Sequence, residues 1–393
     1  MSSRREAART PVRALVSNVL VPLALAVGFF LLLEGGCRVA LRAKTGSWPE
    51  TRAVSYTKFV EKIGRAYRPH PQLVVAGRPD AVLEAIGKTV HFNARGQRAT
   101  NVRDLPLPKP AGVFRIVCTG GSSTFDLLAP DDAATWPARL GTLLAPRVDV
   151  ANAGFPGWTT LESLVSLEIR DVDLAPDLVV VYAGVNDLQP AGHVPFTADY
   201  SLGHADILPR VTGVAPIPVR AVARSVFLEF LLGRLRPRAA APVEGFAAAW
   251  AWPEGKRQDD IPEAAAGVFE RNLRSTIAVA RAHGARVLLV PQTLQVRAGF
   301  ETGDTEWIEA WCPGLTAAGA QRGLSRYAAA MRRLASPPDV LFVEPFAGPV
   351  PAGDFDDACH FSAAGSDRFA RRIAAFLVDV AASAPPARTP PSR

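Results

Sequence analysis

Ser122 follows Gly120 and Gly121 at the end of the apolar run Phe114–Cys118. A short apolar run bounded by glycines predicts a buried strand of a parallel sheet. Two glycines allow a tight turn out of that strand, so the next residue is presented at the strand's carboxyl end. Open α/β sheets bind their ligands at this edge. Ser122 is therefore a candidate nucleophile, although a Gly-Gly-Ser-Ser stretch also occurs in ordinary turns.

Polar residues in three later loops could complete a site around this serine. Asp357 precedes His360 by three positions, and Gly154 and Asn186 each follow an apolar run. A serine that attacks an ester needs an imidazole to take its proton and a carboxylate to fix the imidazole tautomer. It also needs N–H donors aimed at the developing oxyanion. We expect Ser122, His360 and Asp357 to form a triad, and the N–H groups of Ser122 and Gly154 and the Asn186 amide to bind the oxyanion.

Each of these residues also has an ordinary structural explanation. A glycine or asparagine after a strand often only shapes a turn. Asp354 and Asp356 compete with Asp357 for the carboxylate role and are disfavoured by spacing alone. Ser123 is a second hydroxyl in the same turn, and we expect it to cap the segment that follows. Asp187 is expected to shape the loop in which it lies.

The four stretches together resemble the sequence blocks of SGNH (GDSL-type) hydrolases, a family named for its Ser, Gly, Asn and His. The blocks correspond to Gly120–Ser122, Asn152–Gly154, Gly184–Asp187 and Asp357–His360. The resemblance covers about residues 112–382. It implies a flavodoxin-like three-layer α/β/α sandwich, hydrolysis or transfer of ester-linked acyl groups, and no metal or organic cofactor.

The chain departs from this family's signature at two positions. Gly121 replaces the aspartate of Gly-Asp-Ser, and Ser123 replaces the following leucine. We expect both changes to have little effect, because neither position does chemistry in the mechanism above. An N-terminal apolar run and the Asn93–Arg98 stretch (Asn-x-x-Gly-x-Arg) before the serine block resemble membrane-anchored bacterial members.

The elements that must position these residues alternate along the chain. Apolar runs predict further strands at 147–152, 178–182, 287–290 and 340–343, and apolar periodicity predicts helices at 135–145, 160–171, 269–283, 315–334 and 363–381. Strands that alternate with helices imply βαβ units and a parallel sheet. The chain is therefore predicted to have an α/β fold with one hydrolase domain at 111–382.

An insertion at about 190–262 interrupts this alternation. Its segment Val219–Arg236 has apolar residues at helical spacing with interspersed arginines. This pattern predicts a helix packed over the sheet, with a lid or a membrane-skimming helix as the alternative. Residues 34–110 are polar and proline-rich and are expected to form a juxtamembrane stalk, and 383–393 a disordered tail.

The N-terminus carries an apolar segment after a polar, arginine-rich stretch, 1–13. Ala14–Leu33 gives 20 residues without a charge, enough to cross about 30 Å of hydrocarbon as a helix. The only signal-peptidase-like pattern, Ala24–Ala26, lies inside the run. We therefore expect an uncleaved signal anchor that crosses the cell (inner) membrane once, with the catalytic domain on the extracytoplasmic, periplasmic side. Basic residues flank both ends, so the charge bias is slight.

Composition excludes several other functions. The formal charge of +7 comes from 44 Lys and Arg against 37 Asp and Glu, without the basic block that would indicate a nucleic-acid partner. The four cysteines have no metal-binding spacing. In an exported domain Cys312 and Cys359, both expected in loops, could form a disulfide.

The sequence therefore predicts a serine esterase of the SGNH type. From the expected location, its substrates are ester-bearing small molecules, lipids or glycans of the cell envelope. An O-acyltransferase acting on an extracytoplasmic polysaccharide is the first alternative, because a sugar hydroxyl can replace water. A catalytically silent binding or scaffold protein of the envelope is the second.

Overall fold

The computed structural model describes residues 16–45, 65–85, 88–200, 225, 227, 257–295, 305, 308–309, 311–312, 314–346, 350–351 and 353–382. The chain divides into two compact units. The smaller comprises Met1–Glu61 with Val214–Ala239, and the larger comprises Lys62–Gly213 with Ala240–Arg393. All five residues predicted to form the site lie in the larger unit.

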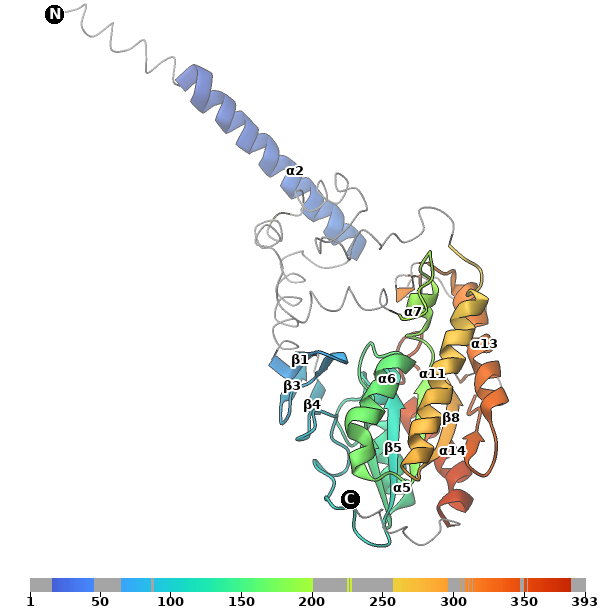
Figure 1. Ribbon diagram of the computed structural model, residues 1–393. Coiled ribbons are helices and arrows are strands. Elements are labelled where there is room, and N and C mark those ends of the chain that lie inside the picture. The colour runs from blue at the N-terminus through green and yellow to red at the C-terminus, as the bar shows by residue number, and fades with distance from the viewer. Residues whose placement is uncertain are drawn as a thin grey trace, which may run out of the picture. The chain divides into compact units, whose positions relative to one another are not determined.

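A five-stranded parallel sheet forms the centre of the larger unit (Figure 1). Its strand order is β6-β5-β7-β8-β9. The strands are β5 (Phe114–Gly120), β6 (Val148–Asn152), β7 (Leu178–Ala183), β8 (Arg286–Pro291) and β9 (Val340–Phe342). Every residue of β5 and β7 is buried. Burial on both faces explains why these strands are continuous apolar runs rather than alternating ones.

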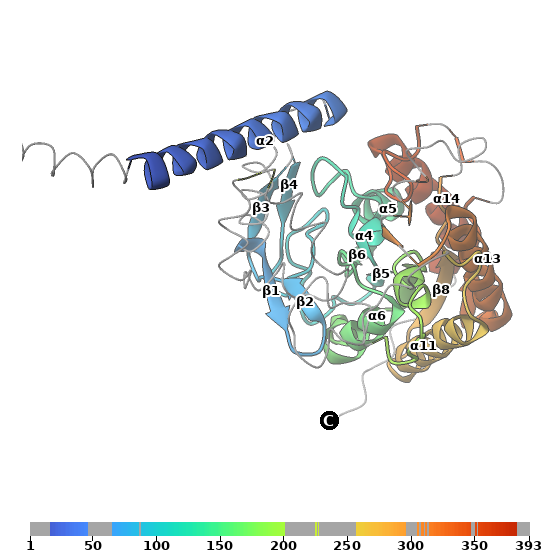
Figure 2. The same ribbon diagram turned by 90° about the horizontal axis from the view of Figure 1, so that it is seen from above.

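Helices cover both faces of this sheet (Figure 2). They are α5 (Trp136–Leu144) and α14 (Ala363–Ala382) on one face, and α6 (Thr160–Ser166), α11 (Glu263–Ala282) and α13 (Ala317–Leu334) on the other. Successive residues of a strand point to opposite faces. Val180 accordingly packs in the cluster of Trp136 and Phe369, and Val181 packs in that of Phe269. This three-layer α/β/α sandwich confirms the predicted fold.

Short elements complete the larger unit. They are α4 (Ser122–Phe125), a π-helical turn η2 (Leu167–Asp171), a 3-10 turn η3 (Val172–Leu174) and α7 (Leu188–Ala191). The helix predicted at 160–171 is confirmed, with α-helical hydrogen bonding up to Ser166 and one π-helical turn after it. Thr159 and Glu162 form a capping box at the start of α6, which fixes where that helix begins.

Residues 65–110 also belong to the larger unit. They form two antiparallel hairpins, β1 (Tyr67–His70) with β2 (Val74–Gly77), and β3 (Val82–Ala85) with β4 (Lys88–His91). Phe92, which follows β4, is fully buried with Phe125, Phe155 and Trp158. The segment upstream of the sheet thus shares an aromatic core with the loops that follow β5 and β6.

The smaller unit contains η1 (Val16–Leu20) and α2 (Val21–Thr45). Within them Ser17–Ala40, with a hydropathy of 2.1, is long and apolar enough to cross a membrane. Length and composition suit a signal anchor and a signal sequence equally. The uncharged run predicted to span the membrane ends at Leu33, but the helix continues beyond it to Thr45. Glu34 accepts hydrogen bonds from Arg38, Ser225 and Phe227.

These contacts also bear on the insertion. Phe227 packs edge-on against Phe30 of α2, with ring centroids 5.8 Å apart. At Ser225 and Phe227 the insertion therefore contacts α2. The rest of Val219–Arg236 and the predicted tail at 383–393 lie outside the described residues.

Candidate active site

Ser122 is the first residue of α4 and lies directly beyond the carboxyl end of β5. Gly120 has φ +152°, and a Cβ there would overlap the Tyr182 carbonyl of the neighbouring strand. A Cβ at Gly121 would overlap the amide nitrogen of Asn186. The two glycines thus allow the chain to turn sharply while the loop after β7 approaches Ser122 closely.

The structure brings Ser122, His360 and Asp357 together in one hydrogen-bonded row. His360 Nε2 lies 2.7 Å from Ser122 Oγ, and His360 Nδ1 lies 2.7 Å from Asp357 Oδ2. The other carboxylate oxygen, Oδ1, accepts the backbone N–H groups of Cys359 (2.9 Å) and His360 (2.8 Å). This arrangement suits a tautomer in which Nδ1–H donates to Asp357 and Nε2 accepts the serine proton.

Charge and burial act on this pair in opposite directions. Burial disfavours the Asp357 carboxylate, but the hydrogen bond and charge of His360 and two backbone N–H groups lower its pKa below the ordinary value. Burial also disfavours the imidazolium of His360, whereas the Cys359 sulfur and the Asp357 carboxylate favour it, and the net effect raises the pKa of His360. The pair is therefore suited to hold a proton taken from Ser122.

Asp354 and Asp356 were the alternatives to Asp357, and Ser123 was the second hydroxyl of the turn. Asp354 is fully buried and ion-paired with Arg368, and the side chain of Asp356 is exposed. Ser123 was expected to cap the segment after the turn. Instead its hydroxyl donates to the Cys359 carbonyl (3.0 Å), and the N-cap of α4 is Gly121. Ser123 thus connects the α4 turn to the loop of the histidine.

Asn186 is 6% exposed and lies in the loop that follows β7. Its Nδ2 donates to the Trp158 carbonyl (2.8 Å), which leaves the second hydrogen of the same amide for another acceptor. The Gly154 N–H donates to the side chain of Asn152 at 3.2 Å. A Cβ at Gly154 would overlap Thr124 and the backbone nitrogen of Phe125, so its loop packs directly on α4.

Asp187 holds the Asn186 loop in place, as the sequence predicted, together with Thr160 and Gln292, which the sequence did not single out. Asp187 is fully buried, and its carboxylate accepts the Thr160 hydroxyl (2.6 Å) and backbone N–H (3.2 Å). Burial raises the pKa of Asp187 to about 7. Gln292 accepts the Val185 N–H at 2.7 Å. The capping-box pattern of Thr159 and Glu162 in the sequence predicts that a helix begins at Thr160, and so could have located this residue.

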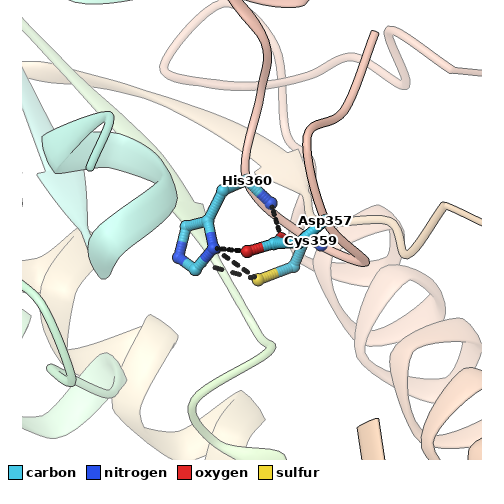
Figure 3. A group of neighbouring side chains, drawn as sticks. All are labelled: Asp357, Cys359 and His360. Atoms are coloured by element: carbon cyan, nitrogen blue, oxygen red, sulfur yellow. Dashed lines mark hydrogen bonds and ion pairs between the residues drawn. The ribbon is translucent and has the colours of Figure 1, made fainter. Parts of the chain in front are cut away.

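Cys359 lies beside the imidazole, with Sγ 3.6 Å from Nδ1 and 3.8 Å from Nε2 of His360 (Figure 3). Donor atoms of Asp357, Cys359 and His360 lie within 4.8 Å of one another and could hold a metal ion. Cys312 and Cys359 are both buried free thiols, so the disulfide considered between them is not formed.

A family model described as the GDSL-like lipase/acylhydrolase family matches residues 118–368. The chain is similar to a catalytic mutant of the acetylxylan esterase Axe2 from Geobacillus stearothermophilus, with 16% identity, a TM-score of 0.39 and coverage of 69% of this chain and 95% of that chain. It is also similar to an α/β hydrolase from the metagenome of Lake Arreo, with 15% identity, a TM-score of 0.38 and coverage of 68% and 95% of the two chains. A GDSL-like lipase from Bacteroides thetaiotaomicron has 14% identity, a TM-score of 0.35 and coverage of 68% and 87%. No curated protein matches the sequence.

Proposed function

Because the chain belongs to the GDSL-like lipase/acylhydrolase family and is an ester-hydrolysing enzyme, we propose that Ser122, His360 and Asp357 are its catalytic triad. The observation that carries this proposal is the pair of 2.7 Å contacts on the two nitrogens of one imidazole. A histidine that bridges a serine hydroxyl and a carboxylate in this way is the arrangement that activates a serine nucleophile.

The reaction proceeds in two halves. Ser122 Oγ attacks the ester carbonyl carbon while its proton passes to His360 Nε2, and the tetrahedral intermediate forms. The bond to the alcohol then breaks as Nε2 returns the proton to the leaving oxygen, and an acyl-enzyme remains. Water then attacks the acyl carbon while its proton passes to His360 Nε2. The bond to Ser122 Oγ breaks as Nε2 returns this proton to Oγ, which releases the acid and restores free Ser122. Asp357 stays ionised and stabilises the imidazolium in both halves.

We propose three donors for the oxyanion. The Asn186 amide has one N–H that Trp158 does not use. The Ser122 N–H lies in the first turn of α4, where backbone N–H groups have no acceptor within the helix. The Gly154 N–H would have to exchange its long contact with Asn152 for the oxyanion. Donors held in place before the reaction stabilise the charge as it develops.

We propose that the substrates are acyl esters on cell-envelope glycans or lipids. The support for this is the apolar helix Ser17–Ala40, which suits a membrane anchor. With the chain anchored in the cell membrane, the catalytic domain would act on the extracytoplasmic side. A reporter enzyme fused after Arg393 should then be active outside the cytoplasm. A reporter that is active only in the cytoplasm would contradict this topology.

Chromogenic esters of increasing acyl length test the catalytic proposal. Ser122→Ala should abolish turnover and labelling by a fluorophosphonate, whereas Ser123→Ala, one residue away, should keep both. Loss of labelling in Ser123→Ala alone would move the nucleophile by one residue. Unlabelled and inactive wild-type protein would favour a silent binding protein, and acylated sugar formed in the presence of a glycan acceptor would indicate transfer.

A further inference from the structure

We propose that Arg98 is a positioning residue for the nucleophile, a role that rests on the proposed function of Ser122. Arg98 lies 20 positions before the first residue of the family match, at residue 118. Its side chain is nevertheless fully buried, and it reaches the far end of the helical turn that begins with Ser122.

The guanidinium of Arg98 bonds to four groups of one loop. Nε donates to Asp132 Oδ1 at 2.9 Å, and Nη2 donates to the Asp131 carbonyl at 3.0 Å. Nη1 donates to the carbonyls of Phe125 (3.1 Å) and Asp126 (2.7 Å). The ion pair with Asp132 balances the buried charge, and the planar fork satisfies several carbonyls that a single ammonium could not reach together.

Two of these carbonyls belong to the end of α4. This helix is a single turn, Ser122–Phe125. The last carbonyls of a helix accept no hydrogen bond from N–H groups of the same helix. Asp126 follows with φ +61°, a left-handed conformation that is uncommon for residues other than glycine but is adopted by Asp more often than by most of them. Asp126 is held there by Arg98 at its carbonyl and by Trp136 and Ser366 at its carboxylate.

The same contacts reach the glycine block. The Phe125 carbonyl also accepts the amide of Asn152 (3.3 Å), and the oxygen of that amide accepts the Gly154 N–H. Arg98 pairs with Asn152 through a backbone bridge as well. Arg98 therefore contacts the two segments that carry the nucleophile and one proposed oxyanion donor, and its loss would let both shift.

Arg98→Lys keeps the charge and removes the fork, and Arg115→Lys is its matched control. Arg115 is equally buried, is paired with Asp149, and donates to the carbonyls of Leu174 and Pro106. It lies at the start of β5, away from α4. Both variants should lose stability, so the difference between them isolates the effect on the site.

We expect Arg98→Lys to lower kcat and the rate of fluorophosphonate labelling by about 10²-fold, the effect of a displacement near 1 Å, with KM changed much less. Arg115→Lys should label at the wild-type rate. Asp132→Asn, which leaves Arg98 in place but weakens its Nε anchor, should lower labelling by about 10-fold.

The outcomes separate this proposal from the catalytic one. If Arg98→Lys does not fold, Asp132→Asn decides. If Arg98→Lys or Asp132→Asn folds and is labelled at the wild-type rate, the positioning role is overturned. A labelling rate lowered as much in Arg115→Lys as in Arg98→Lys would also overturn it. Wild-type protein that neither labels nor hydrolyses esters would instead refute the triad.

Discussion

Replacing Asp357 by asparagine tests how the carboxylate acts on His360. Asp357 Oδ1 accepts two backbone N–H groups. In the asparagine variant only the amide oxygen can accept them, so the NH₂ group must take the place of Oδ2. That place lies 2.7 Å from His360 Nδ1. The amide then donates to Nδ1, Nε2 carries the ring proton, and the imidazole cannot accept the proton of Ser122.

The expected loss follows from this reversed tautomer. The same exchange in a serine protease lowers kcat about 10⁴-fold, equivalent to about 5 kcal/mol of transition-state stabilisation. Both backbone N–H groups keep an acceptor, so the loop should remain folded. The pKa of His360 is raised, with Asp357 among the causes. Because the neutral imidazole is the base, the acid limb of kcat/KM should lie above about pH 6.5 in the wild type and at lower pH in the variant.

The assay is hydrolysis of a chromogenic acetate ester between pH 5 and 9, with thermal unfolding as the check of folding. Asp356→Asn is the matched control, because its side chain is exposed on the same loop. It should leave both kcat and the pH profile unchanged. A folded Asp357→Asn enzyme that keeps a tenth of wild-type kcat would refute the tautomer argument, as would an equal loss in Asp356→Asn.

Three further changes test single contacts. Asn186→Ala should lower kcat by about 10²–10³-fold with little change in KM, and an unchanged kcat would make Asn186 a loop residue only. Ser123→Ala removes the bond to the Cys359 carbonyl and should lower the free energy of unfolding in urea by about 1 kcal/mol. Asp187 has its pKa raised to about 7, so the unfolding free energy should fall as pH rises from about 4 to 7. This decrease in the unfolding free energy should be on the order of 4 kcal/mol in the wild type and absent in Asp187→Asn. The same pH dependence of the unfolding free energy in the wild type and in Asp187→Asn would contradict this prediction.

The fold was predictable because its signals are local. Burial on both faces made β5 and β7 continuous apolar runs, and helical periodicity marked the helices on either side. The glycines at 120 and 121 marked the strand end at which Ser122 lies. The contact between Asp357 and His360 was likewise predictable, because two residues three positions apart in one loop can bring their side chains into contact.

Contacts between distant parts of the chain were not predictable in this way. The hydroxyl of Ser123 bonds to a carbonyl 236 positions later, so its local pattern suggested a cap that it does not form. The apolar run was taken to end at Leu33 because Glu34 is charged. In the structure that charge is balanced by Arg38 and bonded to Ser225, and the helix continues.

Gly121 shows how a local expectation and a long-range contact can differ. Its replacement of the aspartate in the family signature was expected to matter little, because the residue does no chemistry. In this structure, however, a side chain at position 121 would overlap the amide nitrogen of Asn186. The size of residue 121 thus limits how closely the proposed oxyanion donor can approach Ser122. The second position of the serine block and the asparagine block are therefore sterically coupled, although 65 residues separate them in sequence.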